Sequence, residues 1–209
     1  MPNWSLVHQF WFPDHLAESD AAAHARMFAW WFNGGSNAEL APFVPLLAAA
    51  QSGRLEAWGA TPRGRLSLIL LLDQFTRGLH PGSAAAYAND AHALCLAEEM
   101  LAGGQYDALE HVWERTFVLV PLVHAEGPSH LPRALRALAM AEALTEQAPA
   151  HLRPVYAASA ARCGEHVEVI RRFGRFPHRN ARLGRASSPA ELRHLERGAA
   201  METLPQLVA

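Results

Sequence analysis

The sequence contains no lysine, and all 18 of its basic residues are arginine. Set against 20 acidic residues, they leave a formal net charge of -2 at pH 7. This balance argues against bulk electrostatic attraction to nucleic acid or to an anionic membrane surface. Arginine binds carboxylate and phosphate through a planar fork, whereas lysine offers a point charge. Any anion that this chain binds is therefore expected to meet guanidinium groups.

Cysteine and long apolar runs are also scarce. The two cysteines, Cys95 and Cys163, share no metal-ligand spacing, which favours free thiols in a reducing compartment. The strongest apolar run, Leu66 to Leu72, is far shorter than the roughly 20 residues that a membrane-spanning helix needs. The N-terminus lacks a basic region followed by an apolar stretch, so no signal peptide is expected. These features predict a cytoplasmic protein with no membrane partner.

Strand patterns are nearly missing as well, because valine and isoleucine are few and no segment alternates for long. Signals for helix boundaries are frequent instead. They predict helices over approximately residues 20–32, 36–50, 62–77, 83–101, 107–120, 128–147, 151–173 and 188–200. Helices joined by short loops pack as antiparallel hairpins. We therefore predict a single all-α domain over residues 1–209, with seven to nine helices stacked as antiparallel hairpins.

The boundary signals differ in kind. The stretches 36–39 and 188–191 have the form of a capping box, and Thr61-Pro62 reads as an N-cap followed by proline at the first helical position. Gly78 and Pro121 are expected to end the helices that precede them. The residues directly after Pro121 are then expected to form a short loop.

Several polar residues occupy positions where the helical pattern calls for apolar ones, or lie in the loop after Pro121. These candidates for catalysis are Asp73, Asp90, His124, Glu126 and His166. A buried carboxylate needs a partner, and Arg77 is the local partner for Asp73 because it lies four residues further on. A buried aspartate beside arginine is more often a structural ion pair, and a lone histidine is more often a core residue. That structural interpretation stays open for each of them.

The segment from Arg171 to Arg185 holds six of the 18 arginines and no acid. Gly174 and Pro177 predict an irregular loop, and its phenylalanines should pack it down against the protein. Guanidinium groups held in this way must meet anions, which come either from the protein's own carboxylates or from a ligand. The residues predicted to bind such a ligand are Arg77, Arg172, Arg175, His178, Arg179, Asn180 and Arg185.

Five stretches together resemble the family called domain of unknown function 924. They are Leu71 to Arg77, Asp90, His124 to Glu126, His166 and Arg172 to Arg185. The resemblance covers nearly the whole chain and implies a fold similar to tetratricopeptide-repeat proteins, without strict repeats. It implies no activity. The chain departs from the family pattern at Thr76, Gly78, Gly127 and His130, which implies a modified site if those positions belong to one.

These residues favour a pocket for a small anionic molecule, a carboxylate or a phosphate. Histidine and glutamate could add acid–base catalysis in that pocket. A protein-interaction module that takes an acidic peptide in a helical groove stays open. So does a metal-dependent hydrolase, although the spacing of the candidates matches no specific metal motif. Nucleic-acid binding ranks below these, since the chain outside the arginine-rich segment is acidic. No motif indicates a cofactor or an oligomeric state.

Overall fold

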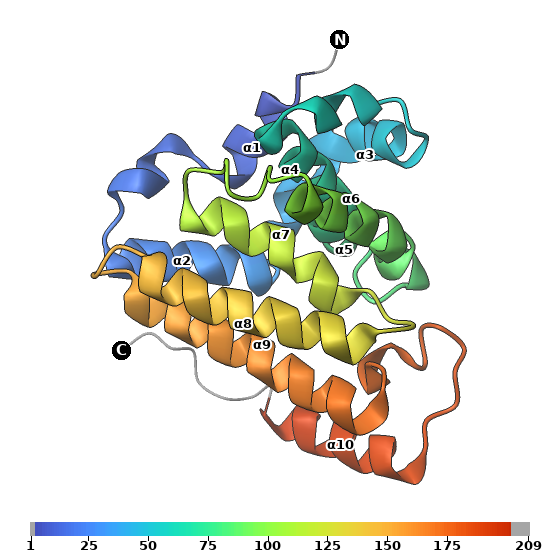
Figure 1. Ribbon diagram of the computed structural model, residues 1–209. Coiled ribbons are helices and arrows are strands. Elements are labelled where there is room, and N and C mark those ends of the chain that lie inside the picture. Colours follow the sequence, from blue (N-terminus) through green and yellow to red (C-terminus); the bar gives the residue numbers. More distant parts are fainter. Residues whose placement is uncertain (1–2, 202–209) are drawn as a thin grey trace.

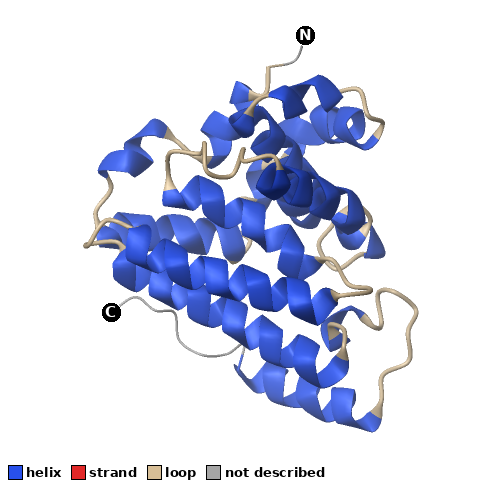
Figure 2. Ribbon diagram, in the orientation of Figure 1, coloured by secondary structure: helices blue, strands red, loops and turns tan. Residues whose placement is uncertain are grey.

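The computed structural model describes residues 3–201, and side chains over residues 3–197. Met1, Pro2 and residues 202–209 lie outside the described part. Within it the chain consists of helices and loops, with no strand, which confirms the all-α prediction (Figure 2). In that same range, none of the helices has the length and apolar character to cross a membrane.

The helices follow one another with short connections (Figure 1). They are α1 (Ser5–Trp11), α2 (Ala21–Phe32), α3 (Val44–Gln51), α4 (Pro62–Leu70), α5 (Thr76–Leu79), α6 (Asp90–Ala102), α7 (Val112–His124), α8 (His130–Gln147), α9 (Arg153–Phe173) and α10 (Pro189–Met201). A π-helical turn, Leu71–Phe75, makes α4 and α5 one continuous helix. Counted in this way the described residues hold nine helices, as the sequence predicts.

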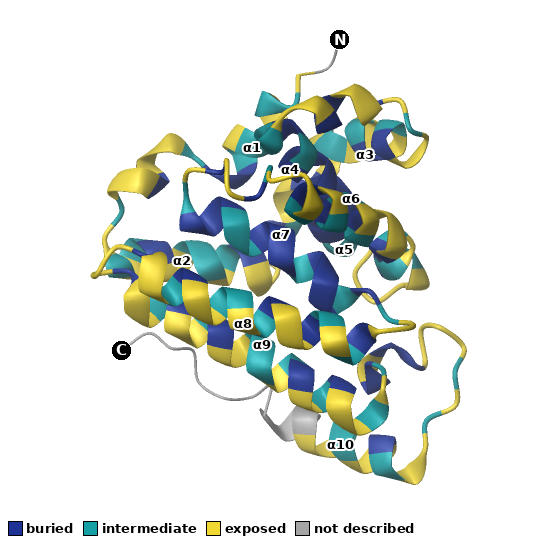
Figure 3. Cartoon of the chain, in the orientation of Figure 1, coloured by how far each residue is buried: buried dark blue, intermediate teal, exposed yellow. Residues whose placement is uncertain are grey.

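Helix α4 lies at the centre of the N-terminal half, where α1, α6 and α7 pack against it. Helices α8 and α9 form a long antiparallel hairpin, and α8 also packs against α7 (Figure 1). Burial follows this arrangement, because the faces of α4 and α7 that meet are buried while the outer faces of α8 and α9 are exposed (Figure 3). The segment between α9 and α10 folds back beside the end of this hairpin.

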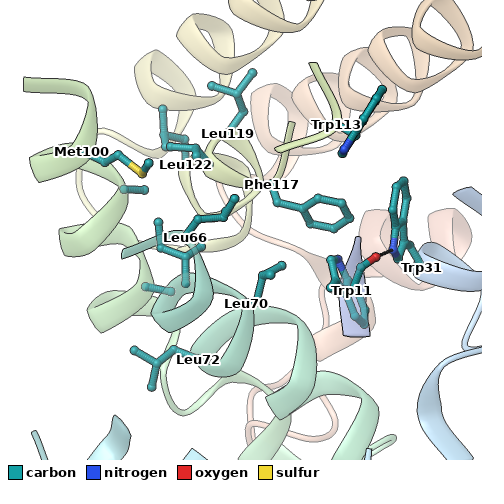
Figure 4. Packing of buried hydrophobic residues seen from close by; sticks show 14 of the residues in the cluster. Trp11, Trp31, Leu66, Leu70, Leu72, Met100, Trp113, Phe117, Leu119 and Leu122 are labelled. Carbon is teal, nitrogen blue, oxygen red and sulfur yellow. Dashed lines mark hydrogen bonds between the residues drawn. The ribbon is translucent and has the colours of Figure 1, made fainter. Parts of the chain in front are cut away.

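The core is rich in aromatic rings from distant parts of the chain (Figure 4). The ring of Phe117 on α7 lies 5.6 Å from that of Trp11 and 5.1 Å from that of Trp31, both at edge-on angles. Trp31 donates its indole Nε1–H to the Trp11 carbonyl at 2.9 Å. Such pairs contribute about 0.5–1.5 kcal/mol each beyond the burial of their surface. They tie the first two helices to α7, which carries part of the site described below.

Two helix starts agree with their sequence signals. The side chain of Thr61 accepts a hydrogen bond from the Gly64 amide at 3.2 Å, and Pro62 is the first residue of α4. At α10, Ser188 Oγ accepts from the Glu191 amide at 3.2 Å, while the Glu191 carboxylate accepts from the Ser188 amide at 2.7 Å. This reciprocal pairing satisfies two amides that the helix itself cannot bond.

Two other boundary predictions are wrong, and a third is displaced by one residue, because α5 ends at Leu79 and not at Gly78. Ser36 makes no side-chain cap, and two 3-10 turns precede α3 where prolines interrupt the amide ladder. Gly78 lies inside α5; a Cβ there would come within 2.4 Å of a Leu40 methyl, so close packing explains the glycine. Pro121 lies inside α7, which begins at Val112 and continues to His124. Burial of the last turn of α7 outweighs the hydrogen bond that proline removes.

Two glycines in helices give a matched test of this packing. A Cβ at Gly64 would lie 2.2 Å from the Trp58 carbonyl oxygen, whereas one at Gly164 would lie 3.9 Å from a Leu138 methyl. We expect Gly64→Ala to lower the free energy of unfolding by about 1–3 kcal/mol, as overpacking does. Gly164→Ala should raise it by about 0.5–1 kcal/mol, because alanine restricts the unfolded chain. Urea denaturation of both variants checks this, and effects of the same sign would contradict it.

Candidate functional site

The π-helical turn Leu71–Phe75 places Asp73 in the interior, where only 1% of it is exposed. The widened turn is held by side chains: Thr76 donates its hydroxyl to the Leu71 carbonyl at 3.1 Å, and Asn89 donates to the Thr76 hydroxyl at 3.0 Å. Single π turns inside α-helices occur frequently at functional sites. Here the turn places a buried carboxylate within hydrogen-bond distance of His124 on α7.

Three side chains contact the Asp73 carboxylate. His124 Nδ1 and Arg77 Nη1 each lie 2.8 Å from Oδ1, and Gln74 donates its amide to Oδ2. Burial alone would raise the pKa of Asp73, but the charge of Arg77 and the hydrogen bonds from His124 and Gln74 outweigh it and hold that pKa below its usual range. The carboxylate is therefore ionised at neutral pH. Arg77 is the partner that the i,i+4 spacing predicts.

Asp90 bridges two arginines. Its Oδ1 lies 2.8 Å from Arg77 Nη2, and its Oδ2 lies 2.9 Å from Arg179 Nη1. Burial, together with the charge of Asp73, raises the pKa of Asp90, whereas the two guanidinium groups that contact this carboxylate oppose the rise. Arg179 is itself only 4% exposed, and its guanidinium lies 4.4 Å from the Tyr87 ring centre and 4.6 Å from that of Phe176. It is thus held between two aromatic faces.

A cavity of about 260 Å³ opens beside these ion pairs. Five of the residues predicted from the sequence line it: Arg77, His124, His166, His178 and Arg179. They come from α5, α7, α9 and the turn Pro177–Arg179, so segments far apart in the sequence meet here. Asp73 and Asp90 lie directly behind the lining, bonded to His124, Arg77 and Arg179.

The three imidazoles that line this cavity favour the neutral form. Burial, together with the charge of Arg77, lowers the pKa of His124, although Asp73 opposes the effect. Burial lowers the pKa of His166 to about 4, assisted by the charge of Arg162. The pKa of His178 is also lowered to about 4, by desolvation and then by Arg179, although the residue remains exposed on the surface. Near pH 7 the site therefore offers imidazole lone pairs.

Arg179 and His124, which both line the cavity, each have a nitrogen without a partner among the described residues. Arg179 uses Nη1 for its ion pair with Asp90, while its buried Nε has no partner among the residues that the structure describes. His124 uses Nδ1 for Asp73, and its Nε2 is bonded to no described residue. Because an ionised carboxylate accepts the Nδ1–H, the proton-free nitrogen is Nε2.

The other predicted residues do not line the cavity. Glu126 accepts hydrogen bonds from the Phe176 amide at 2.7 Å and from both terminal nitrogens of Arg185. Arg175 binds the Glu191 carboxylate with two nitrogens, at 2.8 and 3.0 Å. These pairs fasten the segment between α9 and α10 to the rest of the protein.

The last two predicted residues also lie outside the cavity lining. Arg172 lies over the ring of Phe173, at 4.9 Å, and Asn180 donates to the Ser187 hydroxyl at 3.0 Å. Much of the arginine-rich segment therefore meets the protein's own groups. Fewer guanidinium groups are left for an acidic peptide.

Sequence reasoning missed part of the lining. The sequence predicts only that the phenylalanines of the arginine-rich segment pack against the protein, and it does not distinguish Tyr87, yet the rings of Tyr87 and Phe176 flank Arg179 in the cavity wall. Pro81, Gly82 and Ala86, which form the turn after α5, were not singled out. A Pro-Gly pair predicts a turn, but no sequence signal shows that this turn closes a cavity built from other helices.

The four departures from the family pattern have local roles. Thr76 completes the π-helical turn with its hydroxyl, and Gly78 allows the close approach of Leu40. Gly127 adopts φ +127°, a conformation that side chains other than glycine rarely accept. His130 bonds the Val123 carbonyl at 2.7 Å through Nε2. None of the four lines the cavity.

A metal centre finds no geometric support in the part of the chain that the structure describes. There, no group of three or more histidine, cysteine, aspartate or glutamate side chains is arranged to hold a metal ion. Asp90, His124, Glu126 and His166, the residues considered for a metal-dependent hydrolase, instead bond to arginines, to Asp73, or line the cavity as single imidazoles.

Comparison with known proteins confirms the resemblance. A family model described as "Bacterial protein of unknown function (DUF924)" matches residues 7–199. A solved structure of a protein of unknown function from Agrobacterium tumefaciens is 30% identical, with a TM-score of 0.68. That alignment covers 93% of this chain and 97% of the other. Among curated proteins, no match is found.

Proposed function

The chain belongs to the DUF924 family of bacterial proteins, and we propose from the geometry of its cavity that it binds a small anionic molecule, a carboxylate or a phosphate compound. The observation that carries this proposal is Arg179. Its guanidinium is buried in the cavity wall, and among the residues that the structure describes only Asp90 bonds one of its nitrogens. A buried donor without a partner is costly, and an anion beside this guanidinium would supply charge-assisted bonds.

The aromatic side chains in the cavity wall favour a ligand that is partly apolar. Tyr87 and Phe176 flank Arg179 and also line the cavity. Pockets for small molecules commonly combine such apolar walls with a few convergent polar groups. We therefore propose a compact ligand whose anionic group meets Arg179 and whose body lies against these rings.

His124 is proposed to act on this ligand as a general base. Asp73 accepts its Nδ1–H and so orients the ring with the Nε2 lone pair available. Pairs of this kind, in which a buried carboxylate fixes the tautomer of a catalytic histidine, are a recurrent device for proton abstraction. Arg77 and Gln74 position Asp73 in turn. Glu126, bonded to Arg185, is proposed to fasten the loop instead of moving protons.

Binding can be tested by calorimetric titration with benzoate, using benzamide as its uncharged analogue. Benzoate should bind and benzamide should bind at least about tenfold more weakly, because charge-assisted bonds add about 1.5 kcal/mol or more. Ala86→Leu, which fills the cavity from a buried position, should remove benzoate binding. Ala84→Leu is the matched control, on an exposed position of the same turn. Equal binding of benzoate to both variants would contradict the proposed site.

A further inference from the structure

The fixed charges around the cavity cancel before a ligand enters. Arg77 and Arg179 supply two positive charges, and Asp73 and Asp90, each in direct contact with them, supply two negative ones. Glu126, behind the loop, is balanced by Arg185. An anion that entered this site unaccompanied would therefore leave it with excess negative charge.

The groups able to correct this excess are imidazoles in the cavity wall. His166 on α9 faces the ring of Phe176 and lies near Arg162, Arg179 and His178. These neighbours are cationic or titratable, and among the described residues no carboxylate bonds to His166. Its imidazole is therefore neutral near pH 7 while the cavity is empty.

His178, in the turn after α9, lies near Arg179, Arg182 and His124, with Glu126 as the one acid that favours its protonated form. His124 differs from both, because its Nδ1 is already committed to Asp73. Two imidazoles thus line the cavity with no bonded carboxylate of their own.

Building on the proposed function, we propose that the anion enters this cavity together with protons, which the imidazoles of His166 and His178 take up. A negative charge within about 4–6 Å of an imidazole favours its protonated form. The site would thus discriminate by charge, because a neutral ligand of the same shape brings no such gain. Ligand binding and protonation are then linked, so each strengthens the other.

The direction in which the affinity changes with pH follows from the protonation state of the imidazoles in the empty site. Desolvation at the cavity wall and the nearby arginines lower the pKa of both imidazoles to about 4, although His178 is exposed, so both are unprotonated in the empty site near pH 7. Affinity should then rise as the pH falls, by up to about tenfold per pH unit for each proton taken up. The rise should level off near pH 4, where the empty site becomes protonated as well.

Sulfate is a suitable probe, since it remains a dianion between about pH 5 and pH 8, where histidine charge changes. We would titrate the full chain with sulfate calorimetrically across this range, in two buffers with different ionisation enthalpies. The difference between the buffers measures proton uptake without any variant. The double variant His166→Gln, His178→Gln should lose both the uptake and the pH dependence. His15→Gln, at an exposed histidine outside the cavity, is the matched control.

The possible results distinguish the proposed proton uptake from the proposed anion binding. Proton uptake that disappears in the double variant supports the inference. Sulfate that binds with the same affinity across the range and without proton uptake overturns it, while the anion site itself stands. Uptake that persists unchanged in the double variant also overturns it, and assigns the protons to other groups. Absence of sulfate and benzoate binding at every pH overturns the proposed function and this inference together.

Discussion

Asp90→Asn is expected to lower the free energy of unfolding by about 3–5 kcal/mol, the usual cost of removing one partner from a buried ion pair. The variant keeps the shape of the side chain but leaves the guanidinium of Arg179, which is 4% exposed, without its counter-charge. Arg77 loses one of its two carboxylate partners as well. Urea denaturation at pH 7 measures the change.

Glu99→Gln is the matched control for this variant. It also removes a carboxylate from an ion pair with arginine, Arg65, but the Glu99 side chain is 55% exposed. Pairs in that setting contribute about 0–1 kcal/mol, so a small change is expected. A loss below about 1 kcal/mol in Asp90→Asn would show that Arg179 does not depend on Asp90.

The same variant also reports on the proposed ligand. Without Asp90 the cavity carries one excess positive charge, so sulfate should stabilise Asp90→Asn more than it stabilises the wild-type protein. Stabilisation by a ligand grows with its concentration relative to its dissociation constant. Equal stabilisation of both proteins would place sulfate away from Arg179.

Local chemistry explains which parts of the fold could be predicted. The caps at Thr61 and Ser188 involve side chains and amides only three residues apart, so the sequence contains the whole interaction. Pro121 shows the limit of such signals. Proline usually ends a helix, but α7 continues through it because the turn that follows is buried against other helices. Burial of that kind depends on the assembled fold.

In the candidate site, too, contacts between residues close in sequence could be predicted and contacts between distant residues could not. The pairing of Asp73 with Arg77 follows from their i,i+4 spacing. The bonds from His124 to Asp73 and from Arg179 to Asp90 join residues 51 and 89 positions apart, which no periodicity predicts. For the arginine-rich segment the sequence left open whether protein or ligand supplies the anions. In the structure Arg175, Arg179 and Arg185 are all paired with carboxylates of the protein, and what distinguishes Arg179 is that it also lines the cavity.

A second large effect is expected from His24, far from the cavity. Its ring is fully buried on α2, where Nε2 lies 3.0 Å from the Tyr156 hydroxyl. Burial, and to a lesser degree the charge of His151, lowers its pKa from 6.5 to about 4. The folded protein therefore binds this proton less readily than the unfolded chain does. Its contribution to stability is complete above pH 6.5 and is lost as the pH falls towards 4.

The lowered pKa of His24 corresponds to about 3 kcal/mol, since one pKa unit equals about 1.4 kcal/mol. His24→Gln cannot take up this proton, yet its amide can still bond the Tyr156 hydroxyl. Urea denaturation at intervals from pH 7 to pH 4 should show the wild-type curve falling more steeply, so that the two proteins converge by about 3 kcal/mol. The exposed His15→Gln should follow the wild-type curve. Because His166 and His178 titrate in both proteins, parallel curves would mean that His24 is not the buried proton acceptor that its packing indicates.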